Sequence, residues 1–169
     1  MTPKLISSAP SASLAEGAEF EGELSSGLRD IFEEKIVFNK FLGLKLTSLT
    51  ATHVWARLPM RPELVGNFSA GRLHGGVISA ALDTTGGIAA TAALCARYPN
   101  ESFAQHTLRF AKLGTIDLRI DYLRPGISAL FEIHAEIVRL GSRIANARME
   151  LFDSDGKLVA TGNGVYIVS

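Results

Sequence analysis

The chain has 169 residues, of which 47% are hydrophobic, and this suits a single domain with a sizeable core. Its 17 basic and 17 acidic side chains cancel, so charge gives no reason to expect nucleic acid or an anionic membrane as a partner. The single cysteine, Cys95, excludes an internal disulfide framework and fits a reducing compartment. We find no signal-peptide pattern and no continuous apolar run of the roughly 20 residues that span a membrane, so we expect a soluble, cytoplasmic protein.

The N-terminal part divides into a leader and the start of the domain. Residues 1–24 are rich in Ser, Ala and Pro with weak periodicity, so we treat them as a leader of unassigned function and expect one domain over residues 25–169. From Leu28 to Phe41 apolar residues recur at helical spacing with charged residues between them. This pattern predicts an amphipathic helix that ends near Gly43.

The next segment predicts a pair of strands and then a loop. Residues 44–59 alternate between apolar and polar side chains, with a turn expected at residues 50–52. In the second strand the apolar residues from Val54 to Leu58 share one face. Residues 60–73 contain Pro and several Gly, which predicts a loop that leads to His74.

A long apolar segment runs from Gly75 to Ala96, and Asp83 is its only charged residue. Its length and alanine content predict a helix, and its lack of a polar face predicts burial on most sides. We expect Gly86 and Gly87 to permit close packing of this helix against a strand or a partner. Residues 97–114 predict a loop or a short helix.

The C-terminal part predicts four strands, because apolar and polar residues alternate in four successive runs. Two short polar segments, at residues 141–142 and 153–156, have the composition of hairpin turns. The strands are expected near residues 116–122, 131–137, 145–151 and 158–168. The predicted fold class is therefore α+β, with a four-stranded antiparallel meander and the two earlier strands wrapped around one long central helix.

Asp83 is the first candidate functional residue, because placing a charged carboxylate among apolar residues costs solvation free energy. A carboxylate in an apolar helix loses hydration unless hydrogen bonds or a wet cleft compensate, and such groups often lie at active sites. The alternative is a structural carboxylate that neighbouring backbone or a partner subunit satisfies.

The second candidate is the turn His74-Gly75-Gly76, which precedes the same helix. Glycines let a ligand approach the backbone, and the first N–H groups of a helix lack intrahelical partners. Such N–H groups suit an oxyanion that develops on a thioester carbonyl. An ordinary glycine-rich helix start is the alternative, but here one Asp follows the histidine by nine residues.

Leu73-His74-Gly75-Gly76-Val77-Ile78 with Leu82-Asp83 resembles the signature of the PaaI-like (phenylacetate-pathway-type) hotdog thioesterases. The segment from Thr115 to Pro125 resembles the strand that follows the central helix in that family, and the likeness covers about three quarters of the chain. The resemblance implies a hotdog fold and hydrolysis of an acyl-CoA, with coenzyme A as part of the substrate and no separate cofactor.

The resemblance also implies roles for individual residues. Asp83 would act as general base or nucleophile, the N–H of Gly75 or Gly76 would polarise the thioester carbonyl, and His74 would shape the turn. An Asn before the turn assists in the family; Asn67 is the candidate, seven residues before His74 and one more than the usual spacing. Thr115 would position the attacking water.

Family active sites lie between two subunits, so the resemblance implies a homodimer or a homotetramer built as a dimer of dimers. Arg124, Arg143 and Arg148 lie near predicted strand ends and are candidates for the phosphates of coenzyme A, with ordinary surface arginines as the alternative. The histidines at 53, 106 and 134 lack metal-ligand spacing, so no metal site is predicted.

Two other functions remain open from the sequence: an acyl-thioester hydratase or dehydratase on the same fold, and a non-catalytic acyl-CoA binding or sensing protein. The acyl group is not determined either. Four aromatic residues are candidates for lining an acyl pocket, with simple core packing as the alternative: Trp55, Phe68, Phe103 and Phe110.

Overall fold

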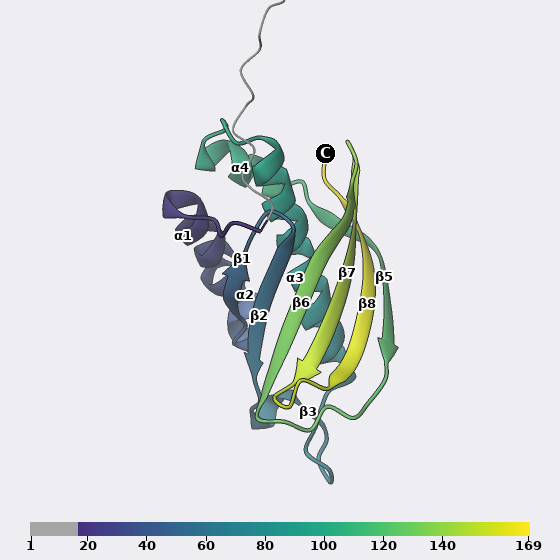
Figure 1. Cartoon of the computed structure of the whole chain (residues 1–169). Helices are drawn as coiled ribbons and strands as arrows, with labels where there is room; N and C mark the ends of the chain where they lie inside the picture. Colours follow the sequence, from purple (N-terminus) through teal and green to yellow (C-terminus); the bar gives the residue numbers. More distant parts are fainter. Residues whose placement is uncertain (1–16) are drawn as a thin grey trace, which may run out of the picture.

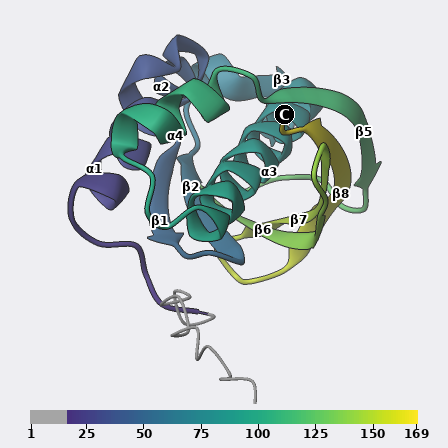
Figure 2. The same cartoon turned by 90° about the horizontal axis from the view of Figure 1, so that it is seen from above.

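The computed structural model describes residues 17–169 (Figure 1). Six of the strands form one antiparallel sheet that curls around the longest helix (Figure 2). The helical elements are α1 (Gly22–Asp30), the π-helical turn η1 (Ile31–Lys35), α2 (Val37–Leu42), the 3-10 turn η2 (Pro62–Leu64), α3 (Gly75–Arg97) and α4 (Phe103–Phe110). The strands are β1 (Lys45–Leu49), β2 (His53–Pro59), β3 (Val65–Asn67), β4 (Arg72–Leu73), β5 (Gly114–Tyr122), β6 (Leu130–Leu140), β7 (Ile144–Asp153) and β8 (Leu158–Ile167).

The sheet order is β1-β2-β6-β7-β8-β5, and α3 fills the concave side of this sheet. This confirms the α+β hotdog fold. The predicted four-stranded meander is wrong at one strand: β6, β7 and β8 are sequential neighbours, but β5 pairs with β8 at the far edge. Alternating side chains report which face of a strand is buried and not which strand lies beside it. The segment after β5 carries the chain past β8 and β7 to reach β6 (Figure 1).

The helix predicted over residues 28–41 is present but interrupted. It begins at Gly22, widens through the π turn, and becomes extended at Ile36 (φ −75°, ψ 94°) before α2. Ile36 N–H donates to the carbonyl of Ile31, five residues back, at 3.0 Å. The end near Gly43 is confirmed, where the left-handed φ of 77° suits glycine.

Residues that precede the predicted domain start at residue 25 already pack against the domain. Phe20 is buried in the core, and the carboxylate of Glu19 accepts a hydrogen bond from Leu49 N–H at 2.8 Å. Residues 1–16, most of the predicted leader, lie outside the described residues.

Regular structure is present both in the segment predicted as a loop and in the segment predicted as a loop or a short helix. Residues 60–73 include η2 and a small antiparallel hairpin, β3–β4, which projects from the body of the molecule beyond the N-terminal end of α3 (Figure 1). Residues 97–114 contain α4, so the short-helix alternative is correct. A capping box formed by Ser102 and Gln105 starts this helix.

The central helix α3 confirms the predicted buried helix, with apolar and small residues on nearly every face. By length and composition alone it is apolar enough to cross a membrane, but 72% of its most apolar window is buried inside the domain. Gly86 packs against the hydroxyl of Tyr166 from β8, where any side chain would overlap the ring. The expected close packing of a strand against this glycine is therefore confirmed.

Candidate active site

The start of α3 is held by the histidine that precedes it. His74 caps the helix: its Nδ1 accepts a hydrogen bond from Gly76 N–H at 2.8 Å, and its carbonyl accepts from the N–H groups of Val77 and Ile78. Within residues 17–169, the N–H of Gly75 has no hydrogen-bond partner. The turn therefore leaves one free donor at the positive end of a long helix dipole.

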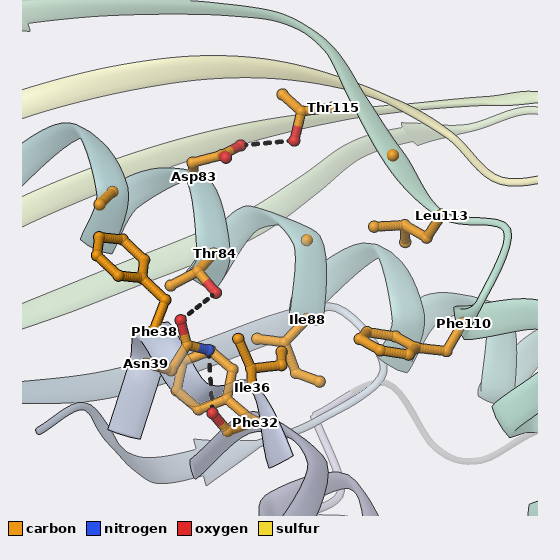
Figure 3. Close-up of a pocket in the computed structure, with 13 residues that line it drawn as sticks. Phe32, Ile36, Phe38, Asn39, Asp83, Thr84, Ile88, Phe110, Leu113 and Thr115 are labelled. Atoms are coloured by element: carbon orange, nitrogen blue, oxygen red, sulfur yellow. Dashed lines mark hydrogen bonds between the residues drawn. The ribbon is translucent and has the colours of Figure 1, made fainter. Parts of the chain in front are cut away.

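Asp83 lies half-buried on the third turn of α3, at the rim of a cavity. One of its carboxylate oxygens, Oδ1, accepts a hydrogen bond from Thr115 Oγ1 at 2.9 Å (Figure 3). The backbone carbonyl of Asp83 accepts a hydrogen bond from the buried Tyr166 hydroxyl at 3.0 Å. Burial, followed by the nearby Asp83 charge, raises the pKa of Tyr166, so this phenol remains a neutral donor.

The cavity beside Asp83 has a volume of about 270 Å³ and is mostly apolar. It lies between α3 on one side and η1, α2 and α4 on the other (Figure 3). Its apolar side chains come from these elements and from the segments that join them: Phe32, Ile36, Phe38, Ala80, Ile88, Phe110 and Leu113. An apolar cavity that ends at a carboxylate suits a ligand with a hydrophobic tail and a reactive polar end.

One polar side chain stabilises the cavity wall opposite Asp83. Asn39 is buried; its Nδ2 donates to the carbonyl of Phe32 at 3.0 Å, and its Oδ1 accepts from Thr84 Oγ1 at 3.0 Å (Figure 3). The π turn leaves the Phe32 carbonyl without its usual helical donor, and Asn39 supplies one. The side chain thus joins η1, α2 and α3 at the cavity.

The structure brings the predicted residues together in two groups. Asp83 and Thr115 form one; His74 and Gly75 form the other, with the Tyr122 hydroxyl donating to the Gly75 carbonyl at 3.1 Å. Eight residues of helix separate Gly75 from Asp83, which is about 12 Å at 1.5 Å per residue. One carbonyl group cannot contact both groups within a single protomer.

The other predicted residues lie outside the cavity wall. Asn67 is exposed on β3, where its Oδ1 accepts from Ser69 Oγ at 2.7 Å. Arg124 donates to the Leu158 carbonyl at 2.7 Å, Arg148 pairs with Glu136 at 3.1 Å on the outward face of the sheet, and Arg143 lies in the turn before β7. Their proposed roles with substrate stay predictions.

Sequence reasoning missed several residues that build the site. Of the four aromatic candidates only Phe110 lines the cavity, whereas Phe32 and Phe38 line it from a helix with no predicted role. The role of Asn39 could have been suspected from the sequence, because it is a polar residue among the apolar positions of the first helix. No local sequence pattern could indicate the role of Tyr166, because its contact with Asp83 joins residues 83 positions apart.

The chain resembles known thioesterases. The family model described as "Thioesterase superfamily" matches residues 70–160, more than half of the chain. A protein of Salmonella typhimurium named "Medium/long-chain acyl-CoA thioesterase YigI" is 34% identical over 82% of this chain and 90% of its own length. The protein of the same name from Escherichia coli is 33% identical over the same shares. A crystal structure from Shewanella oneidensis, described as related to the thioesterase superfamily, has a TM-score of 0.82 and 36% identity over 87% of this chain and 96% of that one.

Proposed function

The chain belongs to the thioesterase superfamily, and we propose that it hydrolyses an acyl-CoA thioester to a free carboxylic acid and coenzyme A. That it is a thioester hydrolase follows from the family. The acyl-CoA substrate is supported by the relatives whose names state that activity. One observation carries the assignment to a site: the Asp83 carboxylate, held by Thr115, lies at the rim of an apolar cavity.

Asp83 acts in this proposal as the general base. Thr115 occupies Oδ1, which leaves Oδ2 to accept a hydrogen bond from water. The water loses a proton to Asp83 as its oxygen bonds to the thioester carbon, and the carbonyl oxygen becomes an oxyanion. A Gly75 N–H donates to that oxyanion. The intermediate then collapses, the carbon–sulfur bond breaks, and the proton passes to the leaving sulfur of coenzyme A; no further cofactor enters the step.

The complete site in this proposal needs two copies of the chain, because about 12 Å of helix separates Gly75 from Asp83 in one copy. Strand β5 is an edge of the sheet, and it exposes Ile116 (55%) and Tyr122 (54%). An unprotected edge of this kind is a natural site for strand pairing. We propose a two-fold dimer through antiparallel β5 strands, as the basic unit of any larger homo-oligomer.

The hydrogen bonds at the two ends of β5 support this pairing. Thr115, at the start of the strand, holds Asp83, and Tyr122, at its end, holds Gly75. An antiparallel pair that sets Thr115 opposite the partner's Tyr122 brings Asp83 beside the partner's Gly75. Each dimer then contains two sites, related by the two-fold axis.

The proposed substrate has an aliphatic acyl chain of medium length. A dry cavity of ~150 Å³ is enough for benzene, and the cavity beside Asp83 has about 270 Å³. Relatives named for medium- and long-chain substrates agree with this size. We also propose that the chain belongs to the PaaI-like subgroup, that Asn67 assists at the reaction centre, and that the protein acts in the cytoplasm. Arg124, Arg143 and Arg148 contact the phosphates of coenzyme A in this proposal.

The experiment is a turnover assay with a panel of acyl-CoA substrates that detects the released thiol. Asp83→Asn should lower kcat/KM by roughly 100-fold or more, because a general base contributes about that factor. Asp30→Asn, an exposed carboxylate on α1, is the matched control and should leave turnover unchanged.

Four results would contradict the proposal. Wild-type turnover by Asp83→Asn would remove the assigned base. Hydroxyacyl product from an enoyl-CoA without thiol release would indicate a hydratase, and tight binding without any turnover would indicate a binding protein. Hydrolysis in ¹⁸O-labelled water that places label in the Asp83 carboxylate would replace the general base with a nucleophile.

A further inference from the structure

Phe68 lies at the tip of the β3–β4 hairpin and is 94% exposed, more than any other large hydrophobic side chain of the described chain. Its neighbours Asn67 and Ser69 are also exposed and hydrogen-bond to each other. A phenyl ring contributes hydrophobic stabilisation to a folded protein or complex only when other apolar groups cover it. Within residues 17–169 no such surface reaches this ring.

The hairpin is fixed to the turn that starts α3. The N–H of His74 donates to the Leu64 carbonyl at 2.9 Å, and Val65 pairs with Leu73. Gly66 packs so closely on His74 that a Cβ there would lie 2.8 Å from the His74 Cα. Whatever positions Gly75 therefore also positions Phe68, which is about three extended residues, or roughly 10 Å, further along the hairpin.

The direction of the hairpin determines where Phe68 lies in a dimer. The hairpin projects beyond the N-terminal end of α3 (Figure 1). In the proposed antiparallel dimer, on which this inference rests, that direction is reversed in the partner. The partner's hairpin therefore starts beside Asp83 and runs toward the C-terminal half of α3, where Ile88, Phe110 and Leu113 line the cavity.

We propose that Phe68 of each subunit closes the partner subunit's acyl cavity at the end formed by Ile88, Phe110 and Leu113, and thereby limits the length of the acyl chain. The occupant of this surface is a second copy of the chain. Phe110 and Leu113 are only half-buried in one protomer, so they have apolar surface left for a ring to cover. The partner contributes in this way a specificity residue as well as the Gly75 donor.

The first test is the chain-length profile of kcat/KM. Phe68→Ala should move the optimum to longer acyl chains, and Phe68→Trp should move it to shorter ones, by about fourfold for each methylene buried or excluded. Val138→Ala, which truncates an exposed side chain on β6, is the control and should keep the wild-type profile. An unchanged profile in both Phe68 variants overturns the proposal.

The second test uses heterodimers that combine an Asp83→Asn subunit with a Phe68→Ala subunit, purified through two different tags. One of the two sites combines both substitutions and is inactive because it lacks the base. The other site pairs an unaltered Asp83 with the partner's unaltered Phe68, so the heterodimer should show the wild-type profile. If the heterodimer instead shows the profile of the Phe68→Ala homodimer, Phe68 acts within its own subunit, which overturns the proposal.

A failure of the role of Phe68 can be distinguished from a failure of the role of Asp83. An active Asp83→Asn homodimer removes the assigned base, and the inference is then decided by binding instead of turnover. Calorimetric titration with non-hydrolysable acyl-CoA thioethers of increasing chain length should show the same shift for Phe68→Ala. A shift that is absent from these titrations, with Asp83 confirmed by the turnover assay, rejects the role of Phe68 alone.

Discussion

At the scale of single residues, the Asp83 carboxylate depends on a neighbour from another element. Thr115 comes from β5, 32 residues later in the chain, and donates to one carboxylate oxygen. A charged hydrogen bond of this kind fixes the orientation of the carboxylate and leaves the second oxygen to bind water. Thr115 is in this account a positioning residue, since it reaches the reacting atoms through Asp83.

The role of Thr115 predicts a specific pair of outcomes. Thr115→Val keeps the shape but removes the donor, and kcat should fall by about tenfold, the equivalent of a hydrogen bond to a charged group. KM should change little, because valine has nearly the same size and shape as threonine and keeps the cavity lining at this position. Thr115→Ser keeps the hydroxyl and should recover most of the activity. Steady-state kinetics on one good substrate measures both; equal losses in the two variants would contradict a role for the hydroxyl.

At the scale of elements, two adjacent glycines in α3 have different neighbours. Gly86 faces β8, where a Cβ would overlap the hydroxyl of Tyr166. Gly87 faces the cavity, where a Cβ would lie 3.6 Å from a methyl group of Leu113, an ordinary contact. The close approach of helix and sheet that lets Tyr166 hold the Asp83 carbonyl therefore depends on the first glycine.

This difference predicts opposite effects of the same substitution. Gly86→Ala should lower the free energy of unfolding by about 1–3 kcal/mol through overpacking. Gly87→Ala should be neutral or stabilising by up to about 1 kcal/mol, because alanine favours the helix more than glycine does. Urea denaturation measures both. Combining Gly86→Ala with Tyr166→Phe, which removes the overlapping oxygen, should cost less than the two single changes added together.

At the scale of the whole molecule, the sheet brings together two histidines from distant segments on its outward face. His53 Nδ1 lies 3.0 Å from His134 Nε2, and the His134 ring stacks on Trp55 with centroids 4.4 Å apart. Burial and then the neighbouring His53 lower the pKa of His134, although Glu150 acts in the opposite direction. Burial also lowers the pKa of His106.

Lowered histidine pKa values predict that acid destabilises the fold. Below the ordinary value of 6.5 the unfolded chain binds protons that the folded histidines do not, so the free energy of unfolding should fall from pH 6.5 down to the folded pKa values. Above pH 6.5 these groups should have no effect. His134→Phe keeps a stacked ring without a titrating group and should show a shallower fall as the pH drops below 6.5. An equally steep fall in the variant would assign the acid sensitivity to other groups.

Features that depend on the local pattern of residues could be predicted from the sequence. Helical or alternating periodicity located α3 and the six strands of the large sheet, and the lone charge in an apolar helix made Asp83 a candidate. The paired glycines after His74 predicted a backbone donor at Gly75 or Gly76, and within residues 17–169 only the N–H of Gly75 has no partner. These features could be predicted because a residue's chemistry and its near neighbours along the chain are enough to define them. The same motifs also indicated the family to which the chain belongs.

Features that depend on contacts between distant segments could not be predicted without the fold. Periodicity does not encode which strand lies beside β5, so the contact of Thr115 with Asp83, the wall formed by Phe32 and Asn39, and the support from Tyr166 all needed the folded chain. The helical spacing of about 12 Å between Gly75 and Asp83 follows from the rise of a helix once α3 is observed as continuous. That spacing, together with the position of β5 at the edge of the six-stranded sheet, explains why the proposed site draws on two copies of the chain.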